Sequence, residues 1–127
     1  MNQLMQPHGT MIVSSNRETQ LQQALEQYLA VLVKEYQAEQ VWLFGSLATG
    51  QVHEWSDIDL LIIKDTDKRF LDRSKELFYL LRPQVGLDLL VYTPHEFEQL
   101  LHEQPFVQEE MIGKGKLLYP LSPCPIG

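Results

Sequence analysis

Two aspartates at alternate positions, Asp57 and Asp59, have the spacing that best fits a cation site in this sequence. They lie in Ser56-Asp-Ile-Asp-Leu-Leu-Ile-Ile63, whose apolar end is typical of a buried strand. Because strand side chains alternate between two faces, both carboxylates point the same way, with Cα atoms roughly 6.6 Å apart. Such a pair repels unless a positive charge lies between its members, and oxygen-only ligands favour Mg²⁺. An isolated Asp-x-Asp is more often a solvated strand start, so further residues must support the metal site.

A third carboxylate, Asp88, lies within the apolar segment Val85-Gly-Leu-Asp-Leu-Leu-Val-Tyr92. Strand alternation places it on the face opposite Leu87 and Leu89. An aspartate in this setting is costly to bury unless it is paired, hydrogen-bonded or bound to a metal. If this strand lies beside the Asp57–Asp59 strand, the three carboxylates form one cluster. Such a cluster can hold two Mg²⁺ ions ~3.5–4 Å apart and stabilise both oxygens of a phosphoryl displacement.

The segment Phe44-Gly-Ser-Leu-Ala-Thr-Gly50 has the composition of a phosphate-binding turn. An apolar strand runs into Gly45 and Ser46, and a short helix follows that Gly50 can end. Glycine lets the backbone approach an oxyanion closely, and the amides at a helix start point toward it with a favourable dipole. The Ser46 hydroxyl adds a donor. Tight strand-to-helix turns often contain Gly-Ser, so the indication depends on the Asp-x-Asp that follows and on Asp88.

Taken together, these segments resemble the minimal nucleotidyltransferases of the DNA polymerase β-like superfamily. The family pattern G-S-x-A-x-G is present at residues 45–50, S-D-x-D-L at 56–60, and the third-strand acid is Asp88. The resemblance extends over roughly residues 21–119. Many members carry arginine where this chain has Thr49, and often a basic residue where it has Leu47. We therefore expect less positive charge near the triphosphate than in those members.

The resemblance implies an α/β fold with a small mixed sheet flanked by helices, and transfer of AMP from ATP to an acceptor hydroxyl. Gly45 and Ser46 would hold the β- and γ-phosphates of the ATP. Asp57 and Asp59 would carry the nucleotide-bound Mg²⁺ and, with Asp88, a second Mg²⁺. Asp88 would also help to deprotonate the hydroxyl, so the three aspartates would be both metal-binding and catalytic. Positioning and charge neutralisation would dominate, because phosphoryl transfer needs little covalent help.

The resemblance also suggests a partner. Single-domain members resemble the antitoxins that bind HEPN-type ribonuclease toxins and adenylylate a tyrosine of the toxin. Only about 30 residues follow the third predicted strand, too few for a separate substrate domain. We therefore expect an antitoxin that modifies a HEPN toxin encoded by the adjacent gene.

Two other functions stay open at this stage. The first is nucleotidyl transfer to a small hydroxylated molecule such as an aminoglycoside, which the acidic balance suits. The second is a module that neutralises a toxin by binding alone and keeps the carboxylates as relics.

The elements that must position these residues alternate between helix and strand, the order of a single small α/β domain. A capping box at Ser15–Glu18 and a helical stripe up to Tyr36 predict the first helix. Short apolar runs predict strands at 41–44, 57–63 and 87–92, with a last strand or clamp at 117–119. Further helices are predicted over 70–81, from the capping box Thr93-Pro-His-Glu96, and over 106–112, closed by Gly113.

The helix whose apolar stripe extends over 70–81 is predicted to begin after a cap at Thr66 or Asp67 and to end at Pro83. Its stripe of core-facing residues is predicted to comprise Phe70, Leu71, Ser74, Leu77, Phe78 and Leu81. We assign residues 15–119 to one nucleotidyltransferase domain. Residues 1–14 and 120–127, which are interrupted by proline and glycine, are predicted to be flexible tails.

Composition excludes several classes of protein. The 127 residues carry 10 Lys and Arg against 17 Asp and Glu, a net charge of −7, which disfavours a general nucleic-acid binder. The single cysteine, Cys124, cannot form an internal disulfide. No apolar run reaches the ~20 residues that a bilayer requires, and no signal peptide is recognisable. We expect a cytoplasmic protein that binds neither membranes nor nucleic acid directly.

Three further features have a structural and a functional interpretation. Trp55 is interpreted as packing on the sheet edge, with stacking on a nucleobase as the alternative. Tyr92 shares the face of Asp88 and either lines the acceptor channel or closes the core. Six of the ten basic residues lie in one stretch and are interpreted as a solvated helix face, with steering of ATP or of an acidic partner as the alternative: Lys64, Lys68, Arg69, Arg73, Lys75 and Arg82.

Overall fold

The computed structural model describes residues 9–120, which form five helices and four strands. The helices are α1 (Gly9–Lys34), α2 (Gly45–Thr49), α3 (Phe70–Leu81), α4 (Pro94–Glu103) and α5 (Pro105–Lys114). The strands are β1 (Gln40–Phe44), β2 (Ile58–Ile63), β3 (Leu87–Tyr92) and β4 (Lys116–Tyr119). This order confirms the predicted alternation and the α/β class. None of the helices in this part of the chain has the length and apolarity needed to cross a bilayer.

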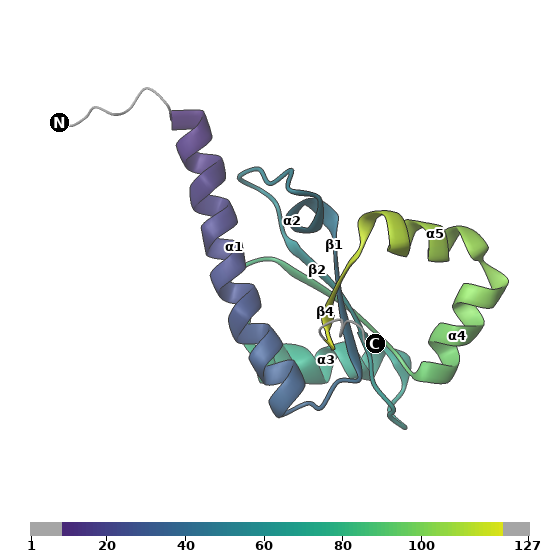
Figure 1. The fold of residues 1–127 in the computed structure, drawn as a ribbon. Helices are drawn as coiled ribbons and strands as arrows, with labels where there is room; N and C mark the ends of the chain where they lie inside the picture. Colours follow the sequence, from purple (N-terminus) through teal and green to yellow (C-terminus); the bar gives the residue numbers. More distant parts are fainter. Residues whose placement is uncertain (1–8, 121–127) are drawn as a thin grey trace.

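The four strands form one mixed sheet in the order β3-β2-β1-β4. β1 is antiparallel to both β2 and β4, whereas β2 and β3 are parallel and are connected through α3. Figure 1 shows α1 and α3 on one side of the sheet, with α4 and α5 projecting beyond its other side. The parallel pair matters for function, because it brings the starts of β2 and β3 to the same edge of the sheet.

The hydrophobic core lies between the sheet and the helices α1 and α3. Its members alternate along the strands, as in the burial pattern of β3, where Leu87, Leu89 and Val91 are buried. The same face of β1 and β2 contributes Val41, Leu43, Ile58, Leu60 and Ile62, and the helices contribute Leu21, Leu25, Tyr28, Leu32, Leu77 and Leu81. The alternate positions of the strands face the other side, where the predicted site residues lie.

The predicted start of the first helix is wrong. α1 begins at Gly9, so Ser15–Glu18 lies inside the helix and does not cap it. Within a continuing helix the amides near Glu18 bond to carbonyls of the preceding turn and leave no role for a serine cap. Residues 9–14 of the predicted tail therefore belong to α1, while residues 1–8 and 121–127, including Cys124, lie outside the described residues.

α3 ends before Pro83 as predicted, but it begins at Phe70, later than a cap at Thr66 or Asp67 would place it, and only part of its predicted stripe is buried. Its N-cap is Arg69, which makes no side-chain capping bond, and the Thr66 hydroxyl instead accepts from the Lys68 amide at 3.1 Å. The buried residues are Arg73, Leu77 and Leu81. Leu71 and Phe78, predicted to face the core, are exposed. The helix is therefore turned so that Arg73 faces the interior together with Leu77 and Leu81, while the rest of the predicted stripe is left out of the core.

Arg73 corrects the interpretation of the basic stretch as a solvated face. Its guanidinium, 5% exposed, donates to the carbonyls of Lys68 at 2.8 Å and Val91 at 3.1 Å. It also donates twice to the Glu96 carboxylate, at 2.6 and 3.1 Å. This pairing lowers the pKa of Glu96 to about 2. The bonds satisfy the buried cation and fasten α3, β3 and α4 together.

The capping box at the start of α4 is confirmed. The Thr93 hydroxyl accepts from the Glu96 amide at 3.1 Å, and the Glu96 carboxylate accepts from the Thr93 amide at 2.9 Å. α5 continues through Gly113 and ends at the C-cap Gly115, so the predicted stop at Gly113 is wrong. Glycine can occupy a helix interior at a cost of only about 1 kcal/mol, which explains why it did not end this one.

Candidate active site

The three predicted acids meet at the edge of the sheet where β2 and β3 begin. In the parallel register Asp59 of β2 lies directly beside Asp88 of β3, and Phe44, the last residue of β1, flanks Asp59 on the other side. Asp57 stands just before β2 and, like Asp59, alternates with the buried residues Ser56 and Ile58. The structure thus confirms the predicted strand adjacency.

The carboxylates differ in exposure and act on one another electrostatically. Burial raises the pKa of Asp59 to about 6, assisted by hydrogen bonding to Asp88 and by the negative charges of Asp88 and Asp57. Asp57 and Asp88 are exposed, so the predicted burial cost falls on Asp59 instead of on Asp88. Burial and the two neighbouring negative charges therefore both disfavour the ionised form of Asp59. A cation bound there would relieve this repulsion.

Two glycines lie directly against the carboxylates of Asp57 and Asp59. A side chain on Gly45 would collide with Asp59 Oδ2, and one on Gly86 would collide with Asp57 Oδ1. Gly45 has φ 77°, a left-handed conformation that also favours glycine. Gly45 was predicted to contact phosphate, whereas no role was predicted for Gly86, although its place just before the Asp88 strand was a usable signal. Both glycines are needed to let the acids lie close to the backbone.

The predicted phosphate turn adjoins the acids. α2 begins at Gly45, the residue that touches Asp59, so the start of this helix and the carboxylates share one edge of the sheet. Gly50 ends the helix with φ 81°, and its amide donates to the Ser46 carbonyl, as predicted. Leu47 is buried in the core, and the Thr49 hydroxyl bonds back to the Gly45 carbonyl at 3.4 Å. Neither residue adds positive charge at this edge.

Arg17 is a site residue that sequence analysis missed. From α1 its guanidinium donates to the Ser56 carbonyl at 3.0 and 2.8 Å, and one of its nitrogens lies 3.8 Å from Asp57 Oδ1. Ser56 itself is buried, and its hydroxyl accepts from the His53 amide at 2.8 Å. The contact spans 39 residues of sequence, so no local pattern could indicate it. Arg17 provides a cation beside the first acid of the cluster.

A small apolar cavity lies next to the Asp59–Asp88 pair. It has a volume of about 280 Å³ and is lined by Phe44, Asp59, Leu60, Leu61, Asp88 and Leu90. Leu90 is 46% exposed, so the cavity opens to solvent beside the acids. Its size and apolar walls suit part of a planar ring.

The two aromatic residues weighed from sequence have different outcomes. Trp55 is 77% exposed, so its interpretation as packing on the sheet edge is wrong. The Tyr92 ring lies 5.4 Å from the Phe70 ring between centroids, in a tilted arrangement, which favours a packing role at the α3 side of the sheet.

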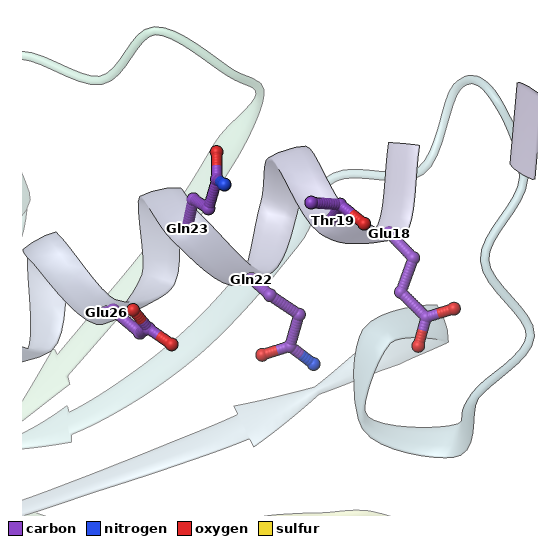
Figure 2. A pocket seen from close by; sticks show the side chains of 5 residues that line it. All are labelled: Glu18, Thr19, Gln22, Gln23 and Glu26. Carbon is purple, nitrogen blue, oxygen red and sulfur yellow. The ribbon is translucent and has the colours of Figure 1, made fainter. Parts of the chain in front are cut away.

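A larger hollow, about 440 Å³, lies along α1 and is distinct from the acid cluster. Figure 2 shows its lining, Glu18, Thr19, Gln22, Gln23 and Glu26, which comes from successive turns of one helix. These side chains all come from a single helix, α1, and the acid cluster lies elsewhere. Size alone is therefore a poor guide to the site in this protein.

The acid cluster offers the oxygen ligands that Mg²⁺ prefers, but its side chains do not enclose a metal ion by themselves. Within residues 9–120 no group of three or more histidine, cysteine or acidic side chains already surrounds one point. Mg²⁺ in nucleotide sites is commonly held by one or two carboxylates together with substrate phosphates, and it keeps several waters. The oxygen donors of Asp57 and Asp59, their mutual repulsion and the open edge fit that mode of binding.

Comparison with known proteins agrees with this geometry. Residues 26–123 match the family described as Polymerase beta, Nucleotidyltransferase. No curated protein matches the chain. A crystal structure from Sulfolobus solfataricus, of a protein assigned by inference as a nucleotidyltransferase, superposes with a TM-score of 0.55 at 19% identity, covering 68% of this chain and 79% of that one. A toxin–antitoxin structure with AMP-PNP matches at 22% identity, covering 74% of this chain and 72% of that one, with a TM-score of 0.48. Because the family match spans most of the sequence, this chain belongs to the polymerase β nucleotidyltransferase family.

Proposed function

We propose that this protein transfers AMP from ATP to an acceptor hydroxyl with the help of Mg²⁺. The observation that carries the proposal is that Asp59 and Asp88 lie side by side on β2 and β3, with Asp57 next to them, at the edge of the sheet where α2 begins. When bound, Mg²⁺ would neutralise the phosphate charge that develops during transfer. The family supplies the reaction class, and the three acids supply the groups that this reaction needs.

The residues of the chain divide the work as follows. Asp57 and Asp59 would hold the metal together with the nucleotide phosphates, and Gly45 and Ser46 would hold the β- and γ-phosphates. The acceptor oxygen forms a bond to the α-phosphorus while the bond from that phosphorus to the bridging oxygen breaks. Pyrophosphate leaves with the electron pair, and Asp88 receives the hydroxyl proton. Asp88 suits this role because its carboxylate is exposed and lies beside Asp59.

We propose further that the acceptor is a tyrosine of a HEPN-type ribonuclease toxin and that the protein acts as its antitoxin. The site supports a macromolecular acceptor because two of its acids are exposed on an open edge of the sheet. The cavity formed with Leu61 and Leu90 provides apolar walls of a size suited to an aromatic ring. An AMP group added to the toxin would repel RNA by charge and would obstruct its active site by bulk.

The test is transfer of label from ATP, labelled at its α-phosphate, to the purified HEPN protein of the adjacent gene in the presence of Mg²⁺. We expect label on the HEPN chain, and its loss in Asp57→Asn and Asp88→Asn. Replacement of the candidate tyrosine by phenylalanine should abolish labelling as well. Absence of label with the wild-type protein, or label that persists in Asp57→Asn, contradicts the proposal.

One observation favours neutralisation of a toxin by binding alone. The positions where many relatives carry basic residues are occupied by the buried Leu47 and by Thr49, which bonds to its own helix. Calorimetry with ATP and Mg²⁺ separates the two functions. Absence of binding at millimolar nucleotide, together with formation of a complex with the toxin, would establish the non-catalytic alternative.

A further inference from the structure

Exposed apolar side chains are concentrated on α3. Among residues whose exposure is described, eight large hydrophobic residues are exposed, and five of them belong to this helix: Phe70, Leu71, Phe78, Tyr79 and Leu80. Leu71 is 71% exposed and Tyr79 is 84% exposed. Scattered apolar residues are normal on a surface, but a contiguous group is typical of a site that binds another molecule.

Three of these exposed residues, Leu71, Phe78 and Tyr79, lie on one face of the helix together with two cations. Leu71, Lys75, Phe78, Tyr79 and Arg82 follow each other at helical spacing, within an arc of roughly 100°. We call these five residues the outward face of α3. The buried residues Arg73, Leu77 and Leu81 occupy the opposite side of the helix, against the core. The outward face therefore intersperses three apolar residues with two cations.

These two cations lack an acidic partner within the described residues. Arg69 lies 3.4 Å from Asp72, and Lys68 lies 4.0 Å from Glu76, whereas Lys75 and Arg82 make no ion pair there. The surrounding stretch holds six of the ten basic residues of a chain whose net charge is −7. The outward face is thus both apolar and positively charged on an otherwise acidic protein.

We propose that the outward face of α3 docks an amphipathic helix of the partner protein, with acidic side chains beside its apolar stripe. Helix-to-helix docking uses apolar residues at this spacing as anchors, and charge complementarity selects the partner. A second α3 is a poor occupant because it would bring the same cations close to each other. The proposal rests on the proposed function in one respect, since it takes the HEPN protein as the partner.

Docking on α3 leaves the catalytic edge accessible. α3 packs on the core side of the sheet, whereas Asp59 and Asp88 alternate with the core residues and face the other side. Binding of the partner and transfer of AMP therefore depend on different residues. This separation makes each of them testable without the other.

The experiment measures the affinity of the full-length protein for the purified HEPN protein by calorimetry. Leu71→Ser/Tyr79→Ser removes exposed anchors without disturbing the core and should weaken binding at least tenfold. Lys75→Glu/Arg82→Glu should weaken it as well, and this loss should shrink as salt increases, because exposed charges are screened. The matched control, Lys34→Glu/Lys116→Glu, reverses two exposed cations elsewhere and should bind like the wild type. Thermal melts establish that each variant is folded, and each α3 variant should bind ATP normally.

The outcomes separate this proposal from the proposed function. If the wild type and Leu71→Ser/Tyr79→Ser bind the HEPN protein equally, docking on α3 is refuted while transfer is unaffected. If the α3 variants lose binding but the wild type transfers no label, docking stands and transfer fails. Docking is also refuted if the wild type does not bind the HEPN protein, or if sedimentation shows that Leu71 and Tyr79 instead mediate self-association.

Discussion

Gly86 offers a direct test of the way in which the backbone positions the first acid. A side chain on this residue would occupy the place of Asp57 Oδ1. The backbone of Gly86 does not adopt a left-handed φ, and its carbonyl accepts from the Ile58 amide at 3.0 Å, a bond that alanine keeps. Gly86→Ala should therefore displace the Asp57 carboxylate while leaving the β2–β3 pairing intact.

The size of the effect follows from the overlap. To restore normal contact distances the carboxylate must move by about 1 Å. A displacement of about 1 Å in a reacting or ligating group costs on the order of 100-fold in rate, which corresponds to about 2.7 kcal/mol. We expect the transfer rate to fall by about this factor and the affinity for ATP with Mg²⁺ to fall about tenfold.

Two other glycines provide matched controls for this substitution. An added methyl group at Gly113 or at Gly50 meets no atom within 4 Å. Gly113→Ala lies in a helix and should retain full activity. Gly50→Ala reports the cost of its left-handed φ of 81° alone, without displacing a carboxylate.

The assay combines calorimetry with ATP and Mg²⁺, transfer of α-phosphate label and a thermal melt of each variant. Unchanged nucleotide affinity and transfer rate in folded Gly86→Ala would refute the claim that Gly86 positions a metal-binding carboxylate. Equal losses in Gly113→Ala would refute it as well, since that variant displaces no acid.

Four further predictions concern the charged residues. Glu96→Gln should destabilise the protein by about 1–2 kcal/mol more than Arg73→Met does, as measured by denaturant unfolding. The reason is that Glu96→Gln leaves the buried Arg73 cation facing a neutral partner. The reverse order of stabilities would contradict this account. The pKa of Glu96 is lowered to about 2 from an unfolded value of 4.5, so its ionised form stabilises the fold at higher pH. The free energy of unfolding should therefore fall by about 1 kcal/mol as the pH decreases from 4.5 toward 2, a figure discounted because the side chain is 40% exposed. A constant free energy of unfolding across that range in the wild type would exclude this contribution. The pKa of Asp59 is raised from 3.8 to about 6, so the free energy of unfolding should fall as the pH rises from 3.8 through 6. After discounting for solvent screening of this partly exposed group, Asp59→Asn should be about 1–2 kcal/mol more stable than the wild type at pH 8 but not at pH 4. Arg17→Met should loosen the segment before β2 and weaken binding of ATP with Mg²⁺, measured by calorimetry, with no such loss in the matched variant Lys34→Met.

The features that sequence could predict depend on local periodicity. Strand alternation placed Asp57 and Asp59 on one side, and the short apolar runs gave the bounds of the strands closely. Asp88 could be placed beside them once its strand was taken as a neighbour of β2. The capping box at Thr93 was predictable because both its partners lie within four residues.

The features that escaped prediction depend on contacts between distant segments. Arg73 looks like a surface cation until Glu96, on another helix, comes within 2.6 Å of it. Arg17 reaches Ser56 in the same way, across the gap between α1 and the start of β2. A hydrophobicity pattern counts an arginine as exposed, so it cannot show that α3 turns this residue inward and leaves Leu71 in solvent.

The attachment of α4 has a consequence for how such proteins diversify. None of the residues of α4 is buried, and the helix is anchored at its root by the Thr93 capping box and by the bonds between Glu96 and Arg73. Figure 1 shows it extending away from the sheet as part of a peripheral arm. Insertions or sequence replacement within the rest of α4, after Glu96, would sacrifice almost no core packing, because none of these residues is buried. The end of this arm could therefore change during evolution to suit new acceptors, while the residues of the acid cluster stay the same.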